Sequence, residues 1–147
     1  LPISTARACA EVGLEPWHDP MNADPHFARV RTRTRVLPML ERELGPGIAE
    51  ALARTADLCR DAAEALDVAA APLISTTLDV DVLASAQPGV RRAAIAAWLT
   101  ERGAPLASWV HVTAVEALVT DWHGQRGIDV AGGAVLREEG YLVYVPR

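Results

Sequence analysis

Apolar and polar positions follow the period of an α-helix over most of the chain. Apolar residues recur three and four positions apart, with charged or small residues between them, which is typical of helices that cover one face. The pattern predicts helices over residues 4–13, 25–44, 48–70, 88–102 and 107–121. Proline or glycine lies near most of the boundaries, where these residue types begin or end a helix. The chain is therefore predicted to be mainly helical.

The helix predicted over residues 25–44 has two local features. Asp24 is placed to cap it, and Pro25 suits its first turn. Pro38 lies inside it, lacks an amide hydrogen and crowds the preceding turn. We therefore expect a kink or a break around residues 35–37.

The last twenty residues change to short apolar runs with β-strand propensity. These runs cover residues 127–130, 134–137 and 141–145, and they are separated by Gly132-Gly133 and by Glu138-Glu139-Gly140. Both separators are hairpin signals. The predicted fold is a mainly α, bundle-like array of helices with a long central helix and a small C-terminal β-hairpin or ribbon.

The best candidate for a domain boundary is Pro72, where the long helix is predicted to stop. Residues 73–87 form a connection that holds one short helix near residues 80–84. We expect two parts, residues 1–71 and residues 72–147.

Length and charge limit the class of protein. The 147 residues suffice for one ordinary domain, or for a domain with an attached fragment. A net charge of −5 argues against a general nucleic-acid coat but is compatible with a local basic stripe. No apolar run approaches the ~20 residues of a membrane span, and no signal-peptide pattern opens the sequence. We expect a cytoplasmic protein with no membrane partner.

The sequence holds few recognisable catalytic patterns. Its four histidines have no metal-ligand spacing, so no metal site is predicted. There is no Gly-rich phosphate loop, no nucleophile elbow and no plausible Ser/His/Asp set. We expect no catalytic residue within this chain.

Four arginines alternate through the second predicted helix: Arg29, Arg31, Arg33 and Arg35. On a helical wheel of about 100° per residue, Arg29 and Arg33 fall within the apolar half. Arg31 and Arg35 fall on the opposite side. A guanidinium on an apolar face needs a carboxylate or a phosphate as a partner.

Two interpretations of Arg29 and Arg33 stay open. In one, Asp19 and Asp24 of the preceding loop fold back, neutralise both arginines and fix the loop to the helix. In the other, the two arginines line a functional cleft and contact phosphate. Arg31 and Arg35 taken alone are most simply a solvated face.

The loop before the helix contains further candidates. Asn22 lies between prolines and is most simply a loop-shaping residue. Trp17 and His18 could stack on a nucleobase, but sequence chemistry favours Trp17 as a lid over the junction between helices.

These residues resemble a known family. The runs Trp17–Asp24, Phe27–Arg33 and Val36–Leu40 resemble the Asp-Pro-x-Asn-x-Asp, Arg-Asn-x-x-Arg and Leu-Pro-x-Leu signature of tRNA(Ile)-lysidine synthetases. The resemblance continues more weakly through the runs Ala53–Cys59, Arg91–Leu99 and Ile128–Val145. One position departs from the signature: Val30 stands where the family usually has Asn.

The resemblance implies a ligase that attaches lysine to C2 of the wobble cytidine of tRNA(Ile), with ATP and Mg²⁺ as cofactors. Members carry an N-terminal domain whose Ser-Gly-Gly-x-Asp-Ser loop holds the ATP phosphates, and these 147 residues contain no such loop. The chain therefore resembles the C-terminal portion. Alone it is expected to be inactive and to bind no cofactor, because lysine and ATP reach the enzyme through the other domain.

The resemblance also implies roles for individual residues. Arg29, Arg31, Arg33 and Arg35 are the candidates for contact with tRNA or a nucleotide. Trp17, Asp19, Asn22 and Asp24 are the candidates for shaping the loop or forming one wall of the active site. Apolar surface left exposed in residues 1–40 would allow a homodimer. The alternative is a stand-alone helical interaction or regulatory module without catalysis.

Overall fold

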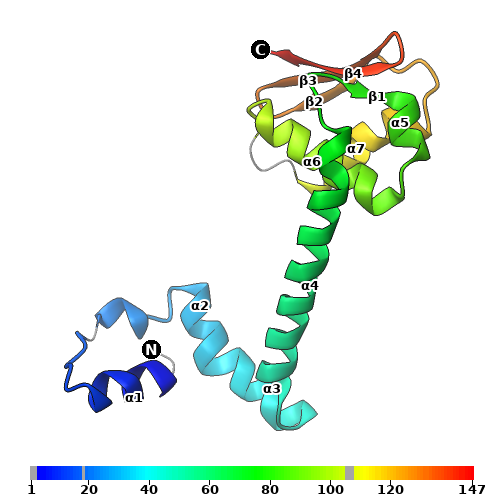
Figure 1. The fold of residues 1–147 in the computed structure, drawn as a ribbon. Coiled ribbons are helices and arrows are strands. Elements are labelled where there is room, and N and C mark those ends of the chain that lie inside the picture. Colours follow the sequence, from blue (N-terminus) through cyan, green and yellow to red (C-terminus); the bar gives the residue numbers. More distant parts are fainter. Residues whose placement is uncertain (1–2, 18, 105–107) are drawn as a thin grey trace. The chain divides into compact units, whose positions relative to one another are not determined.

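The computed structural model describes residues 3–17, 19–104 and 108–147 (Figure 1). Contacts along the chain define two units, residues 1–56 (unit 1) and residues 57–147 (unit 2). The division falls inside the long helix α4 (Ile48–Ala70). The functional boundary that the sequence suggests at Pro72 stays a prediction.

Unit 1 is a succession of short helical segments. In chain order these are α1 (Ile3–Glu11), the 3₁₀ turn η1 (Pro20–Asn22), α2 (Ala28–Arg31), the π-helical turn η2 (Thr32–Val36), α3 (Leu37–Leu44) and the first part of α4. Val30 is the one apolar side chain buried among the described residues of this unit. Unit 1 therefore has almost no core of its own.

The helix predicted over residues 25–44 begins later than expected. Phe27 is the residue that precedes its first turn, and its side chain makes no capping hydrogen bond. The prediction that Asp24 caps this helix is wrong, because its carboxylate accepts a hydrogen bond from the backbone N–H of His26 and closes a turn one step earlier.

The interruption predicted near Pro38 takes the form of the π-helical turn η2. The backbone N–H of Leu37 donates to the carbonyl of Thr32, five residues back, instead of to the carbonyl four residues back. Pro38 has no N–H to continue the regular pattern. One extra residue in the turn accommodates it, as in other π-bulges inside helices.

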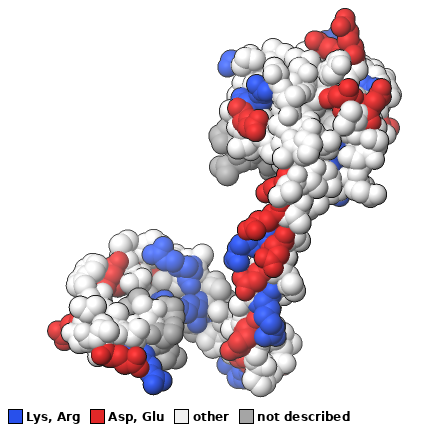
Figure 2. Space-filling view, viewed as in Figure 1, with Lys and Arg blue, Asp and Glu red and all other residues white. Residues whose placement is uncertain are grey.

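Helix α4 has 23 residues, as predicted, and it is covered only at its last turn. Residues 52–69 are exposed, and Ala70 is buried. Acidic and basic side chains alternate along the face of α4 that Figure 2 shows, and Arg60 pairs with Asp57 at 2.7 Å. No helix in the described ranges is long and apolar enough to cross a membrane.

Unit 2 packs helices on a small sheet. After the 3₁₀ turn η3 (Ala71–Leu73), its elements are β1 (Leu78–Asp79), α5 (Val80–Ser85), α6 (Pro88–Glu101), α7 (Trp109–Thr120), β2 (Ile128–Val130), β3 (Gly133–Glu138) and β4 (Tyr141–Pro146). These bounds agree with the predicted elements to within a few residues. The mainly α fold with a long helix and C-terminal strands is confirmed.

The C-terminal strands form a sheet that is larger than the predicted ribbon. It is antiparallel with the order β1-β4-β3-β2. The β3–β4 hairpin turns through Glu139 (φ 48°) and Gly140 (φ 86°), as a type I′ turn requires. The additional strand β1 was not predicted. It has only two residues, paired with β4, and it ends where Asp79 caps α5 through the N–H groups of Asp81 and Val82.

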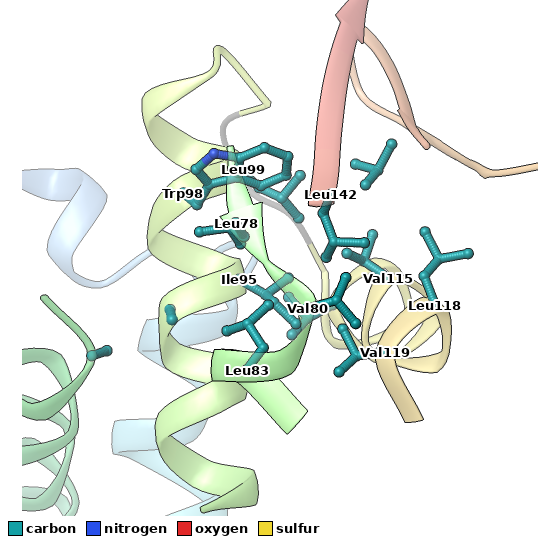
Figure 3. Close-up of a cluster of buried hydrophobic side chains, with 14 of the residues drawn as sticks. Leu78, Val80, Leu83, Ile95, Trp98, Leu99, Val115, Leu118, Val119 and Leu142 are labelled. Carbon is teal, nitrogen blue, oxygen red and sulfur yellow. The ribbon is translucent and has the colours of Figure 1, made fainter. Parts of the chain in front are cut away.

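The core of unit 2 lies between the sheet and the helices α5, α6 and α7 (Figure 3). Trp98 of α6 is fully buried, donates from Nε1 to the carbonyl of Thr76, and meets Tyr144 of β4 edge to face. Among the described residues, the other large side chains with at most 1% exposed surface are Leu78, Leu83, Ile95, Leu99, Leu118 and Leu142. Close packing of such side chains is the main source of stability in a small domain.

Candidate functional sites

The four arginines of the second predicted helix lie on α2 and η2, and all four are exposed. The expectation that Arg29 and Arg33 lie on a covered face is wrong for this chain. The wheel assumed an element packed over the apolar half, whereas Val36 and Leu44 on that half are themselves exposed. Basic side chains are seen over this part of the chain in Figure 2.

The two loop aspartates have local partners. Asp19 accepts a hydrogen bond from the N–H of Met21 and so caps η1. Asp24 accepts from the backbone N–H of His26 and lies 2.9 Å from its Nδ1. The backbone hydrogen bond first, and the imidazole second, lower the pKa of the Asp24 carboxyl below its ordinary value. Both aspartates therefore shape the loop.

Backbone carbonyls, rather than the aspartates, receive the arginine side chains. Arg31 donates to the carbonyls of Pro25 (2.8 Å) and His26 (2.6 Å), and Arg33 donates to the carbonyl of Asn22. Within the part of the chain that the structure describes, no ion pair joins Asp19 or Asp24 to any of these arginines. The interpretation in which the aspartates neutralise Arg29 and Arg33 is therefore wrong for this chain.

The partners of Arg29, Arg31 and Arg33 are neutral groups, so they position these side chains without neutralising their charge. The guanidinium of Arg29 lies 4.8 Å from the centre of the Phe27 ring, a cation–π distance. Arg31 and Arg35, one turn apart, line an open hollow of about 280 Å³ together with Pro25 and His26. A hollow with two guanidinium groups suits an anionic group such as phosphate.

The remaining loop candidates lie as follows. Trp17 is exposed over 79% of its surface and covers no junction in this chain. Its predicted role as a lid is therefore wrong here, although a role as a wall against another domain stays a prediction. Asn22 ends η1 and contributes its carbonyl to Arg33, in keeping with a loop-shaping residue. His18 lies outside the described residues.

Unit 2 contains a buried ion pair that the sequence analysis missed. Arg91 of α6 and Glu116 of α7 are each about 8% exposed, with Nε and Oε1 2.8 Å apart. Arg91 also donates to the carbonyls of Leu83 and Ala86 at the end of α5. Glu116 is the only carboxylate in an otherwise apolar or neutral helix, and that isolation was the available signal for a buried partner.

A second arginine shares the same carboxylate and leads to a surface groove. Arg92 lies 3.3 Å from Oε2 of Glu116, and its guanidinium lies 5.2 Å from the centre of the Trp109 ring. Trp109 is 66% exposed. The groove holds about 450 Å³ between the end of α4, α6 and α7, and Leu66 and Ala93 are among its apolar walls. No spacing along the chain indicates that these residues lie close together.

Most of unit 2 matches a known family of substrate-binding domains. Residues 78–143, which run from β1 into β4, match the family model described as "TilS substrate binding domain". This part of the chain belongs to that family.

Curated relatives extend the match over nearly the whole chain. Proteins named tRNA(Ile)-lysidine synthase are similar to it in Rhodococcus erythropolis (46% identity over 88% of this chain and 41% of the relative) and in Leifsonia xyli subsp. xyli (44% over 98% and 47%). A third, from Nocardia farcinica, is 46% identical over 94% of this chain and 47% of the relative. The resemblance to the tRNA(Ile)-lysidine synthetase family is confirmed, and the chain spans less than half the length of these relatives.

The glycine-rich loop that would hold the phosphates of ATP, the cofactor that this family implies, does not occur in these 147 residues. The only adjacent glycines are Gly132 and Gly133. A Cβ atom on Gly133 would lie 2.4 Å from the carbonyl oxygen of Val145. This space is filled by the neighbouring strand, so the Gly132-Gly133 pair does not form a phosphate-binding loop.

Proposed function

We propose that this chain is the portion of a tRNA(Ile)-lysidine synthetase that follows the nucleotide-binding domain. The complete enzyme would act in the cytoplasm and ligate lysine to C2 of the wobble cytidine of tRNA(Ile) at the expense of ATP with Mg²⁺. This portion would bind tRNA and contribute one wall of the active site. Without the other domain it would not adenylate or ligate.

The observation that carries the proposal is the combination of a substrate-binding domain in unit 2 with an arginine surface in unit 1. Residues 57–147 hold seven Arg and twelve Asp or Glu, whereas residues 1–56 hold seven of each. Phosphate contacts dominate the affinity of proteins for RNA and need clustered cations. The arginines of α2 and η2 are the densest such cluster in the chain.

Within this cluster the two arginine pairs differ. Arg31 and Arg35 share an open hollow that suits a phosphate group. Arg31 and Arg33 both donate to loop carbonyls, and Arg29 lies over the Phe27 ring, so the shared hollow is what distinguishes Arg31 and Arg35. The proposal assigns tRNA phosphate contact to Arg31 and Arg35. Arg29 and Arg33 are assigned contact with tRNA or a nucleotide. In the complete enzyme they would lie on the side that faces the other domain.

The test uses the intact synthetase and two double variants, Arg31→Ala with Arg35→Ala and Arg29→Ala with Arg33→Ala. The first should weaken tRNA(Ile) binding and flatten its salt dependence by about one phosphate contact per arginine. The second should abolish lysidine formation. Arg42→Ala is the matched control, because Arg42 is an exposed arginine of α3 that pairs with Glu43.

Two results would contradict the assignments. An unchanged salt slope in the first variant would show that Arg31 and Arg35 are only a solvated face. Full activity in the second, with only a lower melting temperature, would make Arg29 and Arg33 structural. The competing stand-alone module predicts that no Ser-Gly-Gly-x-Asp-Ser loop is encoded upstream of Leu1 in the same frame.

A further inference from the structure

The groove of unit 2 combines an apolar interior with a planar cationic rim. Its walls include Leu66 of α4 and Ala93 and Ala96 of α6, and Trp109 and Arg92 also line it. Gly89 lets α4 approach closely, because a Cβ atom there would lie 3.2 Å from a methyl group of Leu66. All of these residues belong to one unit. The groove is therefore a property of unit 2 alone.

Trp109 is a large aromatic side chain that the fold leaves mostly exposed while fixing its position. The guanidinium of Arg92 lies over the ring, and Arg92 is itself held by Glu116. Proteins that bind unpaired nucleotides use exposed aromatic rings in this way, with arginine beside them, because every nucleobase has a face that can stack.

The local charge disfavours a ligand with many phosphates. Arg91 and Arg92 share the single carboxylate of Glu116, and with Asp67 included the charges of these four side chains cancel. Asp67 also lines the groove, and the unit as a whole is acidic. A continuous duplex with many phosphates is disfavoured there, whereas one nucleotide with its phosphate near Arg92 is accommodated.

We propose that this groove receives one unpaired nucleotide of the tRNA, with its base stacked on Trp109 and its phosphate beside Arg92. The proposal rests on the proposed function, since it assumes that the substrate of the domain is tRNA. It adds the kind of tRNA element that unit 2 would bind and the two residues that would bind it.

The experiment measures binding of a tRNA(Ile) transcript to the 147-residue chain. Trp109→Leu should weaken binding about tenfold, as expected for loss of one base–aromatic stack, without changing the salt slope. Arg92→Gln should weaken binding and lower the slope by about 0.7, the contribution of one contact to a single strand. A short unpaired oligonucleotide should compete for the groove, and a duplex of the same length should compete poorly.

Trp122→Leu is the matched control. Trp122 is exposed, and the guanidinium of Arg137 lies 5.2 Å from the centre of its ring, the same distance as between Arg92 and Trp109. Trp122 does not line the groove. Its replacement should leave binding unchanged. Unfolding midpoints of all variants would be compared, and since Trp109 is exposed, Trp109→Leu should unfold close to the wild-type midpoint.

The outcomes separate this inference from the proposed function. If the wild-type chain binds tRNA but Trp109→Leu and Arg92→Gln bind equally well, tRNA binding stands and the groove assignment is overturned. Equal losses in Trp109→Leu and Trp122→Leu, or equal competition by the duplex, would also overturn it. If the wild-type chain does not bind tRNA, the role in tRNA binding fails, and the groove assignment fails with it.

Discussion

The most consequential single contact in unit 2 is the buried ion pair between Arg91 and Glu116. It joins α6 to α7, and through the carbonyls of Leu83 and Ala86 it also holds the end of α5. A buried guanidinium needs nearly all of its donors satisfied, and here a carboxylate and helix-end carbonyls satisfy them. The same carboxylate orients Arg92 at the groove. One residue, Glu116, therefore links the stability of the unit to the shape of its candidate binding surface.

Glu116→Ala should lower the free energy of unfolding of unit 2 by about 3–5 kcal/mol, because it leaves the Arg91 charge buried without a partner. Urea unfolding monitored by the fluorescence of the buried Trp98 measures the loss. Asp129→Ala is the control, since the Asp129–Arg147 pair is exposed and should contribute less than about 1 kcal/mol. Replacing Arg91 by Met together with Glu116 by Leu should recover most of the stability. A loss in Glu116→Ala no larger than that in the control would contradict this account.

At the residue scale, the sequence shows where the charged side chains are but does not show which groups they bind. The alternating arginines stand out in the sequence, yet the hydrogen bonds of Arg31 and Arg33 go to the carbonyls of Pro25, His26 and Asn22. Every residue carries a carbonyl, so no residue type marks these acceptors in advance. The buried Arg91–Glu116 pair depends on how α6 crosses α7, and the spacing of 25 residues between its members is no pattern.

At the scale of elements, helix periodicity predicted the helices well, and Pro38 predicted the interruption between α2 and α3. The type of interruption was not predictable, because a kink, a break and a π turn all relieve the same missing N–H. Thr32 and Thr34 add to it, since their hydroxyls donate to the carbonyls of Ala28 and Val30 four residues back. The strand β1 escaped prediction because two residues show no period, and only pairing with β4 defines it.

Pro38→Ala should convert the π turn into regular α-helix. With an N–H restored at position 38, the N–H of Leu37 is expected to move from the carbonyl of Thr32 to that of Arg33. Removal of the proline should stabilise the helix by up to about 3 kcal/mol. The change of register would rotate the arginines of α2 relative to α3 by about one residue, or about 100°, and should weaken tRNA binding. Hydrogen-bond couplings measured by NMR would identify the acceptor of Leu37.

The control for this variant is Pro46→Ala, because Pro46 lies in the turn between α3 and α4 and should leave η2 unchanged. Persistence of the Thr32–Leu37 bond in Pro38→Ala would show that the two threonine hydroxyls, and not the proline, produce the π turn.

At the scale of the whole chain, buried apolar surface and charge are unevenly distributed between the units. Unit 2 contains the core around Trp98, whereas Val30 is the only apolar side chain buried in the described part of unit 1. Exposed apolar residues of unit 1 include Val12, Leu14, Trp17 and Leu44. Conformational entropy opposes folding throughout, so a unit with so little buried surface is only marginally stable by itself. This distribution suits a segment that completes its packing against another domain, as the proposed function requires.

Limited proteolysis of the 147-residue chain should therefore remove unit 1 first, because regions with few buried contacts open at the lowest free energy. A resistant fragment is expected whose N-terminus lies between residues 57 and 72, and mass spectrometry would show whether the exposed turns of α4 survive. A start near residue 57 would follow the contact boundary, and a start near residue 72 would support the functional boundary at Pro72. Leu142→Ala, which truncates a fully buried side chain and should destabilise unit 2 by about 2–5 kcal/mol, should shorten the lifetime of the fragment. Accumulation of a fragment that retains residues 3–44 would contradict the assignment of the stable core to unit 2.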